Sequence, residues 1–127
     1  MMEQGAPDCC EEKELHRDAM HIVRRALPDE TRLHDLAELY KLFSDYSRVK
    51  LLYLLAEAEQ ELCVCDITEL MAINQSAVSN HLRLLRSSKL IKYRKEGKNT
   101  FYSVADSHVR TILRQGMEHF EEEIGER

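Results

Sequence analysis

Two cysteines separated by one residue, Cys63 and Cys65, form the most reactive pattern in the sequence. They lie in a Leu-Cys-Val-Cys segment that we predict to be extended, so both side chains point the same way and both sulfurs can meet one ion. A helix is expected directly after them, and a helix N-terminus favours a thiolate over a thiol. Two thiolates are too few for a closed metal site. Further donors are therefore needed, and the other two cysteines, Cys9 and Cys10, are the candidates.

A second group of metal-binding side chains lies near the end of the chain: Asp106, His108, His119 and Glu122. On one helix the two histidines share a face and lie about 16 Å apart along the axis, too far for a single ion to bridge. An antiparallel second copy of the helix would bring the first pair of one chain beside the second pair of the other. The pattern predicts a twofold dimer with two equivalent N2O2 sites that suit Zn(II) or Co(II). A helix cap with surface histidines is the alternative.

The charges are unevenly placed along the chain. The formal net charge of the 127 residues is −5, which alone would argue against nucleic-acid binding. Residues 83–98, however, contain seven lysines and arginines and one glutamate, a balance of +6. The chain therefore has a basic segment between acidic ends, which is either a solvated helix face or a surface for phosphates.

The apolar periodicity predicts a mostly helical chain with a small β-hairpin. The expected helices cover residues 12–27, 31–43, 46–57, 66–72 and 76–87. Ser44 or Asp45 can cap the third helix, and Asp66 with Glu69 forms a capping box for the fourth. Two alternating segments, residues 90–94 and 100–104, flank a turn with Gly97, and a last helix begins near Asp106 or Ser107.

The pattern also predicts which helix faces are apolar. The second helix is expected to turn Leu33, Leu36, Ala37, Tyr40 and Phe43 inward. The fifth helix is expected to turn Val78, Leu82 and Leu85 toward the core. Asn74 and Gln75 form the turn between the fourth and fifth helices.

These two helices have helix-turn-helix proportions, and the hairpin after them makes the winged form. The N-terminal half of the second helix of such a pair enters the major groove, where hydroxyl, amide and arginine groups suit base edges and phosphates. The predicted contacts from this helix are Gln75, Ser76, Ser79, Asn80, His81 and Arg83. Arg94, Lys95 and Lys98 on the hairpin can neutralise phosphates. A structural helical hairpin with surface charges is the alternative.

Length and composition limit the remaining possibilities. The length fits one domain, here residues 12–127, preceded by a flexible arm of residues 1–11 that carries two cysteines. No long apolar run or signal-peptide core occurs, so we expect a cytoplasmic protein without a membrane partner. No nucleophile with a neighbouring base is found, and we expect no enzyme activity.

The motifs together resemble the ArsR–SmtB family of metal-sensing winged-helix repressors, most of all its CadC branch. The resemblance covers roughly residues 34–122 and rests on four motifs in order: ELCVCD, S-x-x-S-x-H-L, YRKEGK and D-x-H-x10-H-x2-E. It implies a homodimer that binds double-stranded operator DNA, blocks transcription of metal-efflux or resistance genes, and releases the DNA when Cd(II), Pb(II) or Zn(II) binds.

The resemblance also implies two metal sites shared across the dimer. One joins Cys63 and Cys65 of one subunit to Cys9 or Cys10 of the other, and the second uses the four donors of the last helix. The chain departs from the branch at its adjacent arm cysteines and at Asn80, where histidine or glutamine is common. Alternatives are an arsenite or antimonite sensor, a Zn(II) sensor that uses only the last helix, and a thiol-redox switch.

Overall fold

The computed structural model describes residues 13–125, and the side chains of residues 16–122. The predicted arm with Cys9 and Cys10 therefore lies outside the described residues. The described residues form two compact units, one that ends at Asp35 and one that begins at Leu36.

The first described helices are amphipathic but bury nothing completely. Helix α1 (Lys13–Ala26) matches the expected helix, and Asp29 caps helix α2 (Glu30–Lys41) by accepting a hydrogen bond of 2.9 Å from the Arg32 N–H. No residue of α2 is buried, and Leu36 and Tyr40 are 46% and 49% exposed. Among the described residues, the prediction that the apolar face turns inward is wrong for Leu36 and Tyr40, whereas Phe43 packs against the core as predicted.

Helix α3 (Tyr46–Glu57) follows a short 3-10 helix, η1 (Leu42–Ser44), and has the predicted bounds. Asp45 caps it, with its carboxylate 3.0 Å from the Arg48 N–H. That hydrogen bond from the backbone lowers the pKa of Asp45. Leu51, Leu52 and Leu55 of α3 are buried and form the centre of the hydrophobic core.

The cysteine segment differs from the prediction. Strand β1 (Leu62–Cys63) is only two residues long, and helix α4 (Val64–Met71) starts two residues earlier than expected, so Cys65 is helical. The reason is Asp66, whose carboxylate reaches back to the Cys63 N–H at 3.1 Å. Cys63 is thus the N-cap and Asp66 the third helical residue, rather than the cap.

The next helix carries the most accurately predicted face. Ala72 ends α4 in the left-handed conformation, with φ of 60°. Asn74 caps helix α5 (Gln75–Ser87), accepting a hydrogen bond of 2.8 Å from the Ala77 N–H, so the helix begins one residue earlier than expected. Val78, Leu82 and Leu85 are buried as predicted.

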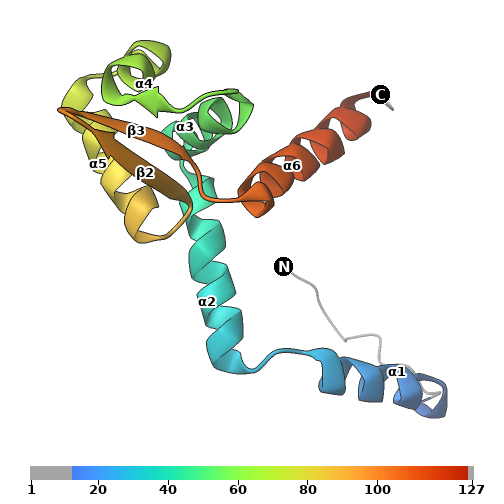
Figure 1. Ribbon diagram of the computed structural model, residues 1–127. Helices are drawn as coiled ribbons and strands as arrows, with labels where there is room; N and C mark the ends of the chain where they lie inside the picture. Colours follow the sequence, from blue (N-terminus) through green and yellow to red (C-terminus); the bar gives the residue numbers. More distant parts are fainter. Residues whose placement is uncertain (1–12, 126–127) are drawn as a thin grey trace. The chain divides into compact units, whose positions relative to one another are not determined.

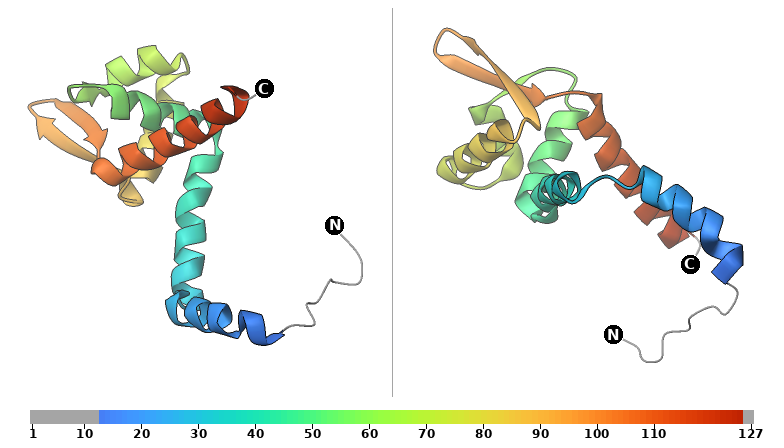
Figure 2. Two further views of the ribbon diagram at one scale, coloured as in Figure 1. Left: turned by 90° about the vertical axis from the view of Figure 1, so that its right-hand side faces the viewer. Right: turned by 90° about the horizontal axis from the view of Figure 1, so that it is seen from below.

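The predicted hairpin is present and belongs to a three-stranded antiparallel sheet in the order β1-β3-β2. Strands β2 (Ile91–Glu96) and β3 (Asn99–Val104) meet at Gly97, whose φ of 62° suits the turn. Figure 1 shows the hairpin beside α5, and Figure 2 shows it from two further sides, projecting from the helices. This is the wing expected from the sequence.

Helix α6 (Ser107–Gly125) ends the described chain. The Asp106 carboxylate caps it, at 2.9 Å from the His108 N–H. Val109 and Leu113 of its first half are buried in the core, and the Arg110 side chain donates a hydrogen bond of 3.0 Å to the Ala56 carbonyl at the end of α3. The fold is thus the predicted winged helix-turn-helix. No helix in the described part of the chain is long and apolar enough to cross a membrane.

Candidate nucleic-acid interface and metal ligands

Helix α5 presents a polar face opposite its buried one. Because Val78, Leu82 and Leu85 fix the rotation of the helix, five of the six predicted contacts lie exposed: Gln75, Ser76, Ser79, Asn80 and Arg83. The sixth, His81, is half-buried.

Two of the exposed side chains on α5 are bonded to each other. The Arg83 guanidinium donates a hydrogen bond of 2.7 Å to the Asn80 side-chain oxygen. This bond leaves the Asn80 NH2 group free to donate and holds Arg83 against the helix. The Arg83 guanidinium and the Asn80 NH2 group are both donors, which suits phosphate oxygens and the acceptor atoms of guanine.

The wing is joined to α5 by a cation–π contact. The Arg86 guanidinium lies 3.9 Å from the centre of the Tyr93 ring, and Tyr93 in turn packs on Tyr102 with ring centres 6.5 Å apart. A hollow of about 370 Å³ between helix and sheet is lined by Ser79, Arg83, Arg86, Ser87 and Tyr102. The arginines of α5 thus lie beside the wing.

The three predicted wing cations differ in their partners. Arg94 is bonded to Glu61, with two nitrogens at 2.8 and 2.9 Å from one carboxylate oxygen, and lies 3.4 Å from Glu96. The bond to Glu61 raises the pKa of Arg94. Lys95 and Lys98 are exposed and form no ion pair within the described part of the chain.

The cysteine pair lies where α4 begins, the first helix of the helix-turn-helix. The Cys63 sulfur donates a hydrogen bond of 3.3 Å to the Asp66 carboxylate, and Cys65 is exposed in the first turn. Both are free thiols. The extended geometry behind the prediction of a shared ion does not apply, since Cys63 is an N-cap and Cys65 is helical.

The donors of the last helix are open to solvent. His108 is 87% exposed at its side chain, and its Nδ1 lies 3.4 Å from the capping oxygen of Asp106. His119 and Glu122 are exposed further along α6. Among the described residues, no three His, Cys, Asp or Glu side chains of one chain are grouped to hold a metal ion. The chemistry of both donor sets still fits a metal, provided that other donors complete each set.

An apolar hollow of about 340 Å³ lies between η1, α3 and α6. It is lined almost entirely by apolar side chains: Phe43, Val49, Tyr53, Ile112, Leu113, Gly116, Met117 and Phe120. Met117 and Phe120 are 39% and 58% exposed. A patch of this kind on a small domain is typical of a protein–protein interface.

Three functional candidates were missed from the sequence. Arg86 could have been found, because it lies three residues after Arg83 and shares its face. Tyr93 could have been found as the aromatic residue of the basic strand. Glu61 gave no signal, since its partner Arg94 lies 33 residues away.

Comparison with known proteins agrees with this geometry. Residues 45–93 match the family model described as bacterial regulatory protein, arsR family. The chain is 38% identical over 113 residues to a transcriptional repressor SmtB homolog of Synechocystis, covering 89% of this chain and 84% of that protein. It is also 38% identical over 112 residues to a cadmium resistance regulatory protein CadC homolog of Staphylococcus aureus, covering 88% and 91%.

A solved structure extends the likeness to three dimensions. The crystal structure of the AntR antimony-specific transcriptional repressor has a TM-score of 0.70 and 26% sequence identity, covering 92% of this chain and 98% of that one. The family, the fold and the relatives are those of DNA-binding regulators and not of enzymes. The chain belongs to the ArsR–SmtB family of winged helix-turn-helix transcriptional repressors.

Proposed function

We propose that the protein is a metal-responsive repressor that binds operator DNA as a homodimer and releases it when a thiophilic ion such as Cd(II) or Pb(II), or Zn(II), binds. The observation that carries the proposal is the position of Cys63 and Cys65 at the N-terminus of α4. Donors for soft metal ions thus lie at the base of the helix pair that reads DNA. The regulated genes would be those for metal efflux or resistance.

The DNA interface consists of the exposed face of α5 and the wing. Gln75, Ser76, Ser79, Asn80 and Arg83 enter the major groove, while Lys95 and Lys98 neutralise phosphates. His81 supports the helix from its half-buried position. The affinity for DNA then depends on where two copies of α5 are held relative to each other, since half-sites lie about 34–36 Å apart.

The homodimer is proposed from the apolar hollow and the donors of α6. If a second copy of the chain covers Met117 and Phe120, the metal-donor side chains of its α6 come close to those of the first chain. Asp106 and His108 of one copy, with His119 and Glu122 of the other, would then hold Zn(II) in a closed N2O2 site.

The regulation follows from linkage between two sites. An ion that binds the DNA-free dimer more tightly than the DNA-bound dimer lowers the DNA affinity by the ratio of those affinities. The thiolate site would be formed by Cys63 and Cys65 with Cys9 or Cys10 of the partner subunit.

A metal-by-metal release assay tests the proposal. The full-length dimer is bound to a labelled duplex selected by the protein from a random-sequence pool, and Cd(II), Pb(II), Zn(II) and antimonite are each titrated. Release by Cd(II) or Pb(II), with a thiolate charge-transfer band, is expected from the wild type. Cys63→Ser should abolish both signals, whereas His119→Gln should leave the Cd(II) response intact and remove only a Zn(II) response.

Two other outcomes of this assay would identify a different inducer. The similarity to an antimony-specific repressor favours an antimonite or arsenite sensor as the second candidate, and release by antimonite alone would establish it. Release by peroxide in the presence of a chelator, with no response to any ion, would identify a thiol-redox switch.

A further inference from the structure

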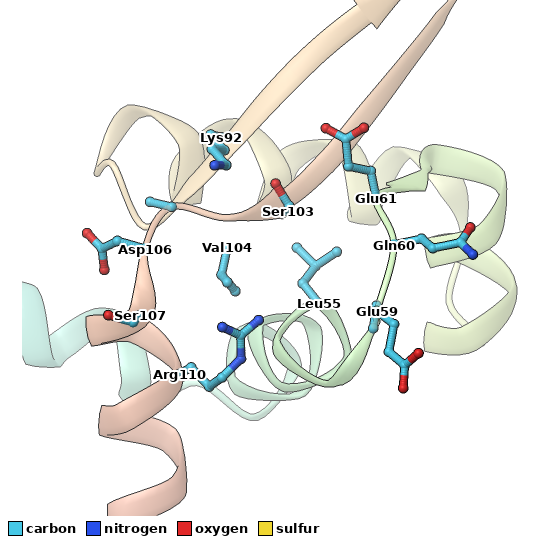
Figure 3. Close-up of a pocket in the computed structure, with 12 residues that line it drawn as sticks. Leu55, Glu59, Gln60, Glu61, Lys92, Ser103, Val104, Asp106, Ser107 and Arg110 are labelled. Carbon is cyan, nitrogen blue, oxygen red and sulfur yellow. The ribbon is translucent and has the colours of Figure 1, made fainter.

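Arg94 lies on the wing, 3.4 Å from Glu96 near the tip, but its two shortest bonds run away from the tip to Glu61. Its Nε and Nη2 both donate to one oxygen of Glu61, at 2.9 and 2.8 Å. Glu61 belongs to the segment between α3 and β1, and Figure 3 shows it on that segment beside the hairpin. The bond therefore connects strand β2 of the wing to the chain two residues before Cys63.

The strand register shows which face of the sheet Arg94 occupies. Cys63 pairs with Phe101, and Phe101 pairs with Arg94, so the three residues form one row across the sheet. Directly paired residues in antiparallel strands point to the same face. The Arg94 guanidinium lies over the Phe101 ring at 5.1 Å from its centre, which agrees with this placement.

The opposite face of the sheet is the one next to the recognition helix. Tyr93, one residue before Arg94, carries the contact with Arg86 of α5. Because side chains alternate along a strand, Arg94 points away from that contact, while Lys95 lies on the same face as Tyr93. Arg94 is thus poorly placed to join Arg83 and Lys95 in a common surface for DNA.

We propose that Glu61 and Arg94 form a latch that fixes the wing to the strand carrying Cys63, so that the conformation of the cysteine segment sets the position of the wing. The inference deepens the proposed function and rests on it for the identity of the signal. Arg94 acts as a positioning residue and not as a phosphate contact. A movement at Cys63 displaces Glu61, two residues away, and strains or releases both bonds to Arg94.

The geometry of the latch makes it sensitive to small movements. Both hydrogen bonds end on a single oxygen, so one displacement weakens both together. Strand β1 is only two residues long and contributes little pairing of its own to hold the segment in place. The Glu61 carboxylate is about one third exposed, with 34% of its side-chain surface accessible, so the bond can open without leaving a buried charge.

The test is a double-mutant cycle with Glu61→Gln, Arg94→Gln and both together. Glu59→Gln and Lys92→Gln are the matched controls, since each removes the same charge from a neighbouring exposed position outside the latch. Hydrogen exchange of the wing amides is measured in the metal-free dimer. Affinity for the selected duplex is measured against salt, with and without Cd(II).

The latch predicts the same phenotype for both single variants. Wing amides exchange faster, the salt slope of DNA binding stays as in the wild type, and the effect of Cd(II) on DNA affinity shrinks by about fivefold or more. The double variant is no worse than either single one, and the two controls behave as the wild type.

Other results would overturn it. If Arg94→Gln lowers the salt slope by about one phosphate contact while Glu61→Gln raises DNA affinity, Arg94 is a phosphate contact for which Glu61 competes. Unchanged wing exchange in both variants would show that the pair positions nothing. If no ion releases the duplex from the wild type, the proposed function fails, and the exchange data on the metal-free dimer still decide whether the latch holds the wing.

Discussion

Helix α5 buries Val78, Leu82 and Leu85 within its own chain, whereas the second half of α6 leaves Met117 and Phe120 exposed. Helix α5 packs against α3, α4 and the sheet, and its polar face is left open for a ligand. Helix α6 buries Val109 and Leu113 of its first half in the core, while its second half borders an open apolar hollow. The helix that we propose reads DNA is therefore completed by one chain, whereas the Zn(II) site that we propose on α6 needs a second chain.

The largest difference between the two regions should appear in stability. Leu82 is 2% exposed, and Leu82→Ala should lower the free energy of unfolding by about 2–5 kcal/mol through lost burial and a residual cavity. Leu84→Ala, on the same helix but 39% exposed, is the control and should cost less than about 1 kcal/mol. Urea unfolding measures both, and equal losses would contradict the assignment of the buried face.

The second prediction concerns the exposed half of α6. Phe120→Ala should leave the fold of the single chain intact and weaken self-association by about 10-fold or more, because the ring is 58% exposed in the single chain and the proposed partner would cover it. Sedimentation equilibrium measures the change, with Glu121→Gln as the neighbouring control. A dimer as strong as the wild type would place the interface elsewhere.

A smaller effect is expected at the wing. Replacing Lys95 and Lys98 together by glutamine should weaken DNA binding and reduce the slope of log affinity against log salt by about 2, since each phosphate contact contributes about 0.9. Fluorescence anisotropy at several salt concentrations measures the slope. Lys92→Gln, on the other face of the same strand, should change neither quantity, and an equal effect there would mean non-specific attraction.

The smallest effect is expected at the cap of α3, the helix that packs against α5. The pKa of Asp45 is lowered in the folded chain, first by the hydrogen bond from the Arg48 N–H. The capping charge therefore stabilises the fold above the ordinary value of 3.8, and this stabilisation is lost as the pH falls through the lower folded value. Asp45→Asn should lose less Tm than the wild type on acidification in that range. Parallel Tm losses would exclude Asp45 as a contributor.

The fold could be predicted from the sequence where the signals are local. Asp45, the alternating strands around Gly97 and the apolar positions of α5 each act within a few residues, and all three predictions are confirmed. The observed start of α4 differs from the predicted one because two overlapping patterns fit a capping box. Cys63 with Asp66 and Asp66 with Glu69 have the same spacing, and only the folded chain shows that the first is used.

The candidate site could be predicted only in part. Helical geometry fixes the exposed residues of α5 once the buried ones are known, so their placement could be predicted from the sequence. The bond between Glu61 and Arg94 joins distant segments through the sheet register, and no periodic pattern reports such a pair. The metal ligands stay predictions, because the donors on α6 are open to solvent and Cys9 and Cys10 lie outside the described residues.

The hydrogen bond between the Cys63 thiol and Asp66 has a consequence for timing. The half-buried Cys63 thiol, which caps the helix, should react with an alkylating reagent more slowly than the exposed Cys65 two residues later. The ratio of the two labelling rates therefore measures how strongly the folded start of α4 protects Cys63. The same two sulfurs that we propose bind the inducer thus also report on the start of α4 in its absence.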